Sequence, residues 1–492
     1  MDSRRRLSGA REPRYENVVL KRIQPRPLRN DPIKPESRFP VKKDSLFENY
    51  LNRYAAGLPW RLQAADSRAC EQIVVIPAYA ERDSLFCTLA SVAANPEAML
   101  EKTMVLCVVN NRAASPAEDK ENNAQTLAML NALVRRQPFD IPEADGKVRE
   151  AWQAVAASPL RLGFIDATSP GLEIPDRAGG VGMARKIGMD AALRLLATSE
   201  QKPRLILSLD ADTLVRPDYL SGVRSAFASG RAAAAGIVDY EHQMPADEAQ
   251  REAIIRYEIF LRYWVLGLQF ACSPYAFHSI GSTMATTDEG YLSVRGMNRR
   301  EAGEDFYFLN KLAKAGPLRR IRETRVYPSG RASARVPFGT GAAVAKMVSG
   351  ARSDFLLYDP RIFVVLRAWI ALMNDSFEDT ADEILGKAKE IHPGLSEFLA
   401  ARGFLTIQPR IRANVKDRRT YERQMHGWFD GFETLKLING LTRDFYPKIL
   451  LPAAVTQILE MQNLECPRRF SGESAPGSED CMEMLSYLRG LT

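Results

Sequence analysis

Two carboxylates follow the apolar run at 205–209, where the sequence reads Leu-Ile-Leu-Ser-Leu-Asp-Ala-Asp. Such a run suits a strand buried on both faces, as in a parallel sheet. Acids at the end of a buried strand cost desolvation energy unless a cation meets them. Because side chains two apart on a strand share a face, Asp210 and Asp212 could converge on one Mg²⁺ or Mn²⁺, an ion usually shared with substrate phosphates. The alternative is a strand end followed by an Asp-rich turn, and the spacing alone leaves both interpretations open.

A second pair of acids, Glu304 and Asp305, precedes residues 306–312, whose pattern predicts a helix. A carboxylate within hydrogen-bonding reach of a hydroxyl can take its proton during a reaction. Adjacent acids are also common at helix starts, because negative charge suits the first turn. The two interpretations are compatible, since a helix start is a rigid place from which to present a base.

Strands and helices alternate between residues 71 and 330, which predicts an α/β sandwich with a mainly parallel sheet. Ligands of such sheets gather beyond the carboxyl ends of the strands. The candidate residues follow three of those ends: Pro77, Tyr79 and Glu81 after the first strand, Asn110 after the second, and Asp210 and Asp212 after the fourth. The expected strands are 73–76, 104–109, 161–165 and 205–209, and the expected helices are 85–94, 124–136 and 182–197.

Composition and periodicity divide the 492 residues into three parts. Residues 1–45 form a basic tail rich in proline and arginine, 46–344 form the α/β domain, and 345–492 form a mostly helical region. Helical spacing in the last part is clearest at 381–389, 395–401, 421–437 and 449–461.

The net charge of +7 is a property of the tail, because residues 1–43 hold 13 Lys/Arg against 5 Asp/Glu and leave 54 basic and 55 acidic residues elsewhere. With few large apolar residues, the tail is expected to be disordered until bound. It could contact an anionic membrane surface peripherally, or be a solvated arm with no specific partner; no specific nucleic acid is expected.

The cysteine pattern fits a protein of a reducing compartment. Its six cysteines lie far apart, as in a protein without a disulfide framework, and its four histidines show no zinc-ligand spacing. Arg4-Arg5-Arg6 is not followed by the apolar segment of a secretory signal, and no run approaches the roughly 18 apolar residues of a membrane span. We therefore expect a cytoplasmic protein, either soluble or peripheral to the inner face of the membrane.

Five motifs in order resemble family 2 glycosyltransferases of the GT-A fold over residues 71–330. They are Val-Ile-Pro-Ala-Tyr-Ala-Glu at 75–81, an apolar strand into Asn110, Gly-Gly-Val-Gly-Met-Ala-Arg-Lys at 179–186, Asp-Ala-Asp at 210–212 and Gly-Glu-Asp at 303–305. The resemblance implies a Rossmann-like GT-A domain, a nucleotide-sugar donor, a divalent cation and, in most members, inversion at the anomeric carbon.

The resemblance also implies roles for individual residues. Asp212 would ligate the metal, and Asp210 would assist it or hold the ribose. Asp305 would take the acceptor proton, with Glu304 as the next candidate. Arg185, which opens the helix after the glycine-rich turn, would lie near the donor phosphates, where a helix N-terminus also favours anions. Arg185 could instead be an ordinary surface residue of that helix.

Two departures from the family pattern concern the donor. Asn110 and Asn111 stand where the family often has an aspartate contacting the nucleotide base, and an amide can still bond a base edge. Some members supply a metal-binding histidine after the Glu-Asp pair, but no histidine lies between 279 and 391. Arg331 and Arg335 lie nearby instead, and could bind a donor phosphate or an anionic acceptor bidentately, or belong to a solvated basic loop.

Two other functions compete with sugar transfer. A nucleotidyltransferase acting on a sugar phosphate would need a glycine-rich phosphate loop after the first strand, and the Pro-Ala-Tyr-Ala-Glu sequence at 77–81 argues against one. A non-catalytic nucleotide-sugar-binding protein would not need its acids, and the intact Asp210, Asp212 and Asp305 argue against that interpretation.

Overall fold

The computed structural model describes residues 43–492 apart from 58, 67, 177–179, 230–232, 302, 334–338, 351–355 and 468–475. Residues 1–42 of the predicted tail therefore lie outside the described residues. The chain divides into two compact units, which we call the sheet unit and the helical unit. Among the described residues, the helical unit consists of Phe270–Ser273 and Tyr358–Lys448. The sheet unit consists of the residues up to Gln269, Pro274–Leu357 and Ile449–Thr492.

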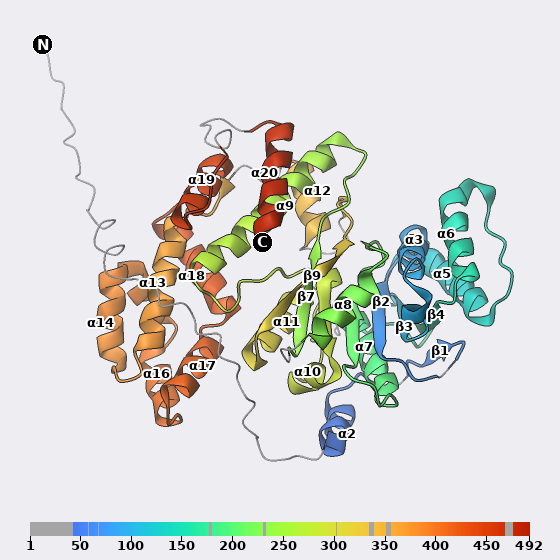
Figure 1. Ribbon diagram of the computed structural model, residues 1–492, viewed down its shortest axis with the longest axis horizontal. Helices are drawn as coiled ribbons and strands as arrows, with labels where there is room; N and C mark the ends of the chain where they lie inside the picture. Colours follow the sequence, from blue (N-terminus) through green and yellow to red (C-terminus); the bar gives the residue numbers. More distant parts are fainter. Residues whose placement is uncertain are drawn as a thin grey trace, which may run out of the picture. The chain divides into compact units, whose positions relative to one another are not determined.

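The sheet unit is built on nine strands in the order β1-β4-β3-β2-β5-β8-β7-β9-β6 (Figure 1). The neighbours β4, β3, β2 and β5 run parallel, and β8 is antiparallel to both β5 and β7. The predicted α/β fold with a mainly parallel sheet is confirmed. The strands are β1 Leu62–Ala64, β2 Gln72–Ala78, β3 Thr103–Asn110, β4 Arg161–Ala167, β5 Leu205–Ser208, β6 Leu214–Val215, β7 Ala235–Tyr240, β8 Met284–Thr287 and β9 Leu318–Tyr327.

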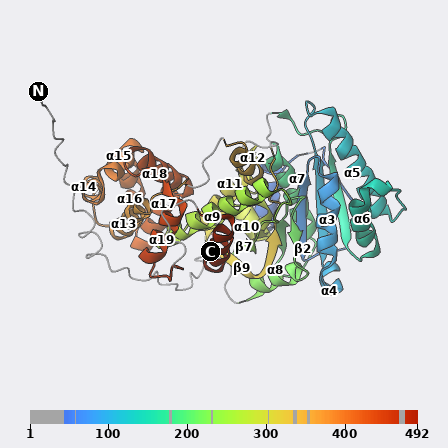
Figure 2. The same ribbon diagram turned by 90° about the horizontal axis from the view of Figure 1, so that it is seen from above.

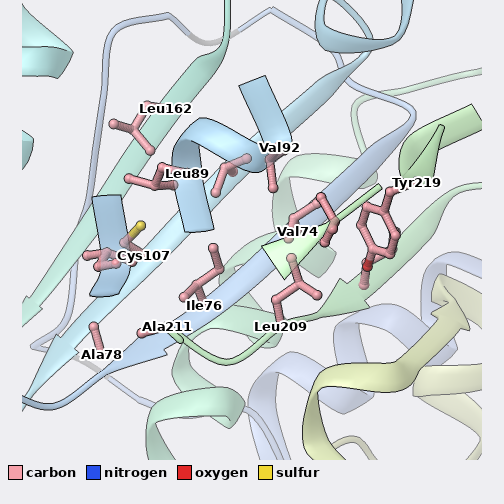
Figure 3. Close-up of a cluster of buried hydrophobic side chains, with 14 of the residues drawn as sticks. Val74, Ile76, Ala78, Leu89, Val92, Cys107, Leu162, Leu209, Ala211 and Tyr219 are labelled. Atoms are coloured by element: carbon pink, nitrogen blue, oxygen red, sulfur yellow. The ribbon is translucent and has the colours of Figure 1, made fainter. Parts of the chain in front are cut away.

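Successive residues of β2 point to opposite faces of the sheet, as strand geometry requires. Val74 and Ile76 belong to one core, beneath α3 (Arg82–Ala93), α5 (Ala117–Arg135), α6 (Gly146–Ala157) and α8 (Tyr219–Ala228). Figure 3 shows them among Leu89, Cys107 and Tyr219. Ile73 and Val75 belong to the opposite core, with α2 (Lys43–Arg53), α7 (Val181–Leu196) and α11 (Glu304–Ala315). Figure 2 shows α3 and α7 on opposite sides of β2, so both faces of the central strands are covered.

A glycine sets how closely α7 approaches the sheet. A Cβ at Gly188 would overlap the side chain of Val75, so the helix can lie this near to β2 only without one. The close packing fixes the position of the first turns of α7, which carry Arg185.

The remaining elements of the sheet unit surround this core. They are α4 Glu97–Leu100, η1 Glu143–Asp145, α9 Glu248–Phe270, η3 Gly281–Thr283, α10 Asp288–Ser293, α12 Thr340–Val348, β10 Leu356–Leu357, β11 Ile449–Leu450, α19 Leu451–Met461 and α20 Ser478–Leu491. Within the described ranges, no helix combines the length and the apolar character needed to cross a bilayer.

One predicted helix of the helical unit is divided in the structure. The expected helix at 421–437 is two helices, because the chain breaks at Phe429 and Asp430 caps the second one by accepting hydrogen bonds from Phe432 N (2.9 Å) and Glu433 N (3.2 Å). Trp369 forms the centre of this unit, with its ring against those of Phe404 and Phe429. The helices are α13 Arg361–Asp375, α14 Ala381–Ile391, α15 Pro393–Ala401, α16 Phe404–Ala413, α17 Arg418–Trp428 and α18 Gly431–Asp444.

Candidate active site

The two acids after β5 lie in a turn and not on the strand. The strand ends at Ser208, and Thr213 N donates to Asp210 O at 3.1 Å to close the turn. Two side chains hold the main chain of this turn: Thr88 Oγ1 donates to Ala211 O at 2.9 Å, and Gln243 Nε2 donates to Asp212 O at 2.8 Å. The alternation of a strand therefore does not extend to the carboxylates, and each of them meets a different arginine.

Arg185 is the partner of Asp210. Its guanidinium is 3% exposed and forms ion pairs with Asp210 and, at 3.2 Å, with Glu304, while its Nε lies 3.4 Å from Ser208 Oγ. A Cβ at Gly281 would overlap this guanidinium, so the glycine makes room for it. Instead of projecting from a helix surface, Arg185 links the turn after β5 to the first residue of α11.

Glu304 and Asp305 begin α11, and the preceding Gly303 has a left-handed φ of 70°. Glu304 is buried, and burial raises the pKa of its carboxyl to about 7 even though Arg185 opposes the shift. Burial likewise raises the pKa of Asp305, which accepts a hydrogen bond from Phe306 N at 2.7 Å and remains partly exposed. The pair thus combines a buried acid with a partly exposed neighbour, at the rigid start of a helix.

Arg331 is the partner of Asp212. Its guanidinium forms an ion pair with Glu81, which directly precedes α3, and another with Asp212 Oδ2 at 3.1 Å. The Arg331 side chain is 39% exposed and that of Asp212 is 24% exposed, so both can be reached from solvent. The other predicted arginine of this segment, Arg335, lies outside the described residues.

The side-chain amide of Asn110 has a fixed orientation. Its NH₂ group donates to Ala78 O (3.0 Å) and to Val108 O (3.2 Å), and because carbonyls can only accept, the amide oxygen must face away from both. Asn123 supports the same strand ends by donating to Asn110 O at 3.0 Å. Asn110 therefore braces the ends of β2 and β3 and retains only an acceptor for a ligand.

The other predicted residues after β2 have structural partners. Pro77 is paired in register with Val108 inside the sheet. The Tyr79 hydroxyl donates to Asp119 Oδ2 at 2.5 Å. Both residues belong to the same edge of the sheet as Asn110.

Three residues that hold this site together were not predicted from the sequence: Ser208, Asn123 and Gln243. Ser208 lies inside the apolar run at 205–209, and a polar residue inside a buried strand indicates a buried partner. Asn123 lies within a helix, where no local pattern distinguishes it. Gln243 follows β7, and the apolar stretch before it could have been recognised as another strand whose end reaches the site.

The site thus consists of two clusters on one edge of the sheet. One contains Arg185 with Asp210 and Glu304, and the other contains Arg331 with Asp212 and Glu81. The Asp210–Asp212 turn belongs to both. Among the residues that the structure describes, no three His, Cys, Asp or Glu side chains are grouped so as to hold a metal ion by themselves.

Comparison with known proteins agrees with the motifs. The sequence model described as Glycosyl transferase family group 2 matches residues 205–373, the part of the chain that carries both pairs of acids and Arg331. The resemblance to family 2 glycosyltransferases is thereby confirmed. No curated protein sequence gives a significant match.

Two solved structures are similar over much of the chain. TarS 1–349 of S. aureus in complex with UDP-GlcNAc is 12% identical, with 73% of this chain and 89% of that chain covered and a TM-score of 0.33. The mannosyltransferase PcManGT of Pyrobaculum calidifontis, in complex with GDP-Man and Mn²⁺, is 13% identical, with coverage of 90% and 91% and a TM-score of 0.32.

Proposed function

We propose that this family 2 glycosyltransferase moves a sugar from a nucleotide-diphosphate donor to an acceptor hydroxyl, with inversion at the anomeric carbon. One observation carries the proposal: Arg185 bonds both to Asp210 of the turn after β5 and to Glu304 at the start of α11. The turn expected to serve the donor and the helix start that carries Asp305, the expected base, are thereby joined at one site.

Asp305 is the base of the proposed reaction. It takes the proton of the acceptor hydroxyl while the hydroxyl oxygen attacks the anomeric carbon, and the bond from that carbon to the diphosphate oxygen breaks. Only the deprotonated carboxylate can accept the proton. Because burial raises the pKa of Asp305, its carboxylate is a stronger base than an exposed aspartate.

The leaving diphosphate gains negative charge, which cations at the site would stabilise. Arg331 is half-exposed beside Asp212 and supplies two or more N–H groups suited to phosphate oxygens. Asp212 suits a divalent cation that is shared with the donor, because its carboxylate already pairs with a cation and is accessible. When bound, Mn²⁺ or Mg²⁺ would neutralise diphosphate charge.

Asn110 would contact the nucleotide base. Its amide oxygen faces away from the two carbonyls, so it suits a base edge that offers an N–H donor. Uracil, thymine and guanine have such a group at neutral pH. UDP-, dTDP- and GDP-sugars are therefore the donor classes to test first.

A thermal-shift panel tests the proposal. Each donor class is added at a saturating concentration with and without Mn²⁺, and the preferred one should raise the melting temperature, since a ligand at about 100 times its Kd stabilises by about 2.7 kcal/mol. Transfer is then followed by release of the nucleoside diphosphate, and NMR of the product gives the anomeric configuration. Failure of every donor to stabilise the protein would refute the proposed function.

A further inference from the structure

Gln243 joins two segments that carry functional side chains. Its Nε2 group donates to Asp212 O at 2.8 Å and to Tyr327 O at 2.6 Å. Asp212 lies in the turn after β5, and Tyr327 ends β9, four residues before Arg331. One amide group therefore connects the backbone of the turn that carries Asp212 to the backbone of the segment that leads to Arg331.

The residue before Gln243 is anchored in a buried polar cluster. His242 donates through its main-chain N to Glu258 Oε2 at 3.0 Å, and its Nδ1 lies 2.9 Å from the same oxygen. The carboxylate of Glu258 also accepts hydrogen bonds of 2.8–3.0 Å from Arg262 and Arg489. Because Glu258 and His242 are fully buried and bonded, Gln243 extends from a fixed point.

The main chain of Gln243 makes the same connection. Its N donates to Pro328 O at 2.9 Å. A Cβ at Gly330 would overlap the main-chain oxygen of Gln243, so this glycine allows the segment at 327–331 to lie against residue 243. The side chain and the backbone of Gln243 thus hold one segment from two directions.

We propose that Gln243 is a positioning residue of the donor site, which fixes Arg331 relative to Asp212 and so sets the arrangement of charges that receives the donor diphosphate. The inference rests on the proposed function, because it takes the ligand of this cluster to be a nucleoside diphosphate. Gln243 need not touch the ligand; it acts through the 3.1 Å pairing of Arg331 with Asp212.

Two independent substitutions disturb the connection. Gln243→Met keeps the length of the side chain and removes both N–H donors, while Gly330→Ala introduces the overlap with the Gln243 oxygen and leaves the Gln243 side chain intact. Each should weaken binding of UDP or GDP, measured by calorimetry with Mn²⁺, by about tenfold, the equivalent of one to two hydrogen bonds. The transfer assay should show the loss mainly in the KM for the donor.

A double-mutant cycle separates positioning from a general loss of structure. If Gln243 acts through Arg331, then Gln243→Met should weaken binding far less in an Arg331→Met background than in the wild type. Amide hydrogen exchange of the Gln243→Met protein without nucleotide should rise together in peptides covering 210–213 and 326–332. Equal tenfold losses in both backgrounds would overturn the proposal.

Gln408→Met and Gly427→Ala are matched controls. Gln408 Nε2 also bonds a main-chain oxygen, that of Asp379 at 3.2 Å, but in the helical unit, and a Cβ at Gly427 would meet no atom within 4 Å. Both controls should bind nucleotide like the wild type. If the wild type binds none of UDP, dTDP and GDP, the proposed function fails. If wild type, Gln243→Met and Gly330→Ala bind alike, only the role of Gln243 fails.

Discussion

Replacing Glu304 by glutamine should change the pH dependence of stability in a defined direction. Burial raises the pKa of Glu304 from its ordinary 4.5 to about 7 in the folded protein. Between these two values the folded state keeps a proton that the unfolded state has released, so the stabilisation is complete below pH 4.5 and is lost as the pH rises to about 7. Glu304→Gln keeps the shape of the side chain and does not titrate.

The size of the effect follows from the separation of the two pKa values, which corresponds to about 3 kcal/mol at most. The free energy of unfolding of the wild type minus that of Glu304→Gln should therefore decrease by up to about 3 kcal/mol between pH 4.5 and pH 7.5. Urea unfolding of both proteins at four pH values in this interval, with hydrogen exchange of the β2 peptides to isolate the sheet unit, measures it.

Glu433→Gln in the helical unit provides a control of opposite sign. Burial raises the pKa of Glu433, and the hydrogen bonds of 2.6 and 2.7 Å from Arg402 lower it. On balance, the pKa of Glu433 lies below its ordinary value. The stabilisation by Glu433 should thus be lost as the pH falls, and no comparable change is expected above pH 4.5. If the difference for Glu304→Gln is constant, or increases with pH, then the ion pair with Arg185 dominates over burial and our argument is refuted.

Four further predictions concern binding, turnover and folding. Asp305→Asn should retain donor affinity in calorimetry and lose about 10²- to 10⁴-fold in transfer rate, and near wild-type turnover would show that the base lies elsewhere. Asp212→Ala should weaken binding of the nucleoside diphosphate at least tenfold, as a chelator does to the wild type, and unchanged binding would exclude Asp212 as a ligand. Asn110→Asp, which introduces the aspartate that the family often has, should destabilise the protein by about 1–3 kcal/mol in urea unfolding, because a carboxylate oxygen would face two main-chain carbonyls. Deleting residues 1–43 should reduce sedimentation with anionic liposomes, and added salt should do the same to the intact protein, whereas salt-insensitive sedimentation would exclude an electrostatic contact.

The parallel half of the sheet could be predicted because its strands are short apolar runs that each end in polar residues. The run at 205–209 is a clear case, since it ends in two acids. The half that holds β8, β7, β9 and β6 could not, because β9 carries four arginines within its ten residues and its pattern resembles that of an exposed segment. Its position is determined by pairing with β7, which is a tertiary contact.

The sequence indicated where the candidate residues lie relative to strands and helices, but not which side chains they contact. Asp212 follows a strand, and Asp305 lies at the start of a helix. Both positions can be recognised from the local sequence. The burial of Arg185 is not local, because its partners Asp210 and Glu304 lie 25 and 119 residues away and meet it only through the packing of α7 and α11. Sequence spacing could not distinguish that arrangement from a surface arginine.

The shared bonding of Arg185 has a consequence for how this enzyme can change. Removing either Asp210 or Glu304 leaves a buried guanidinium with one acid where it had two, so substitutions at the two acids should show strong epistasis. Lysine cannot replace the arginine, because an ammonium group lacks the planar fork that reaches two carboxylates at once. Variants selected for a new donor are therefore expected to accumulate around the more accessible Arg331 and to leave the Arg185 cluster unaltered.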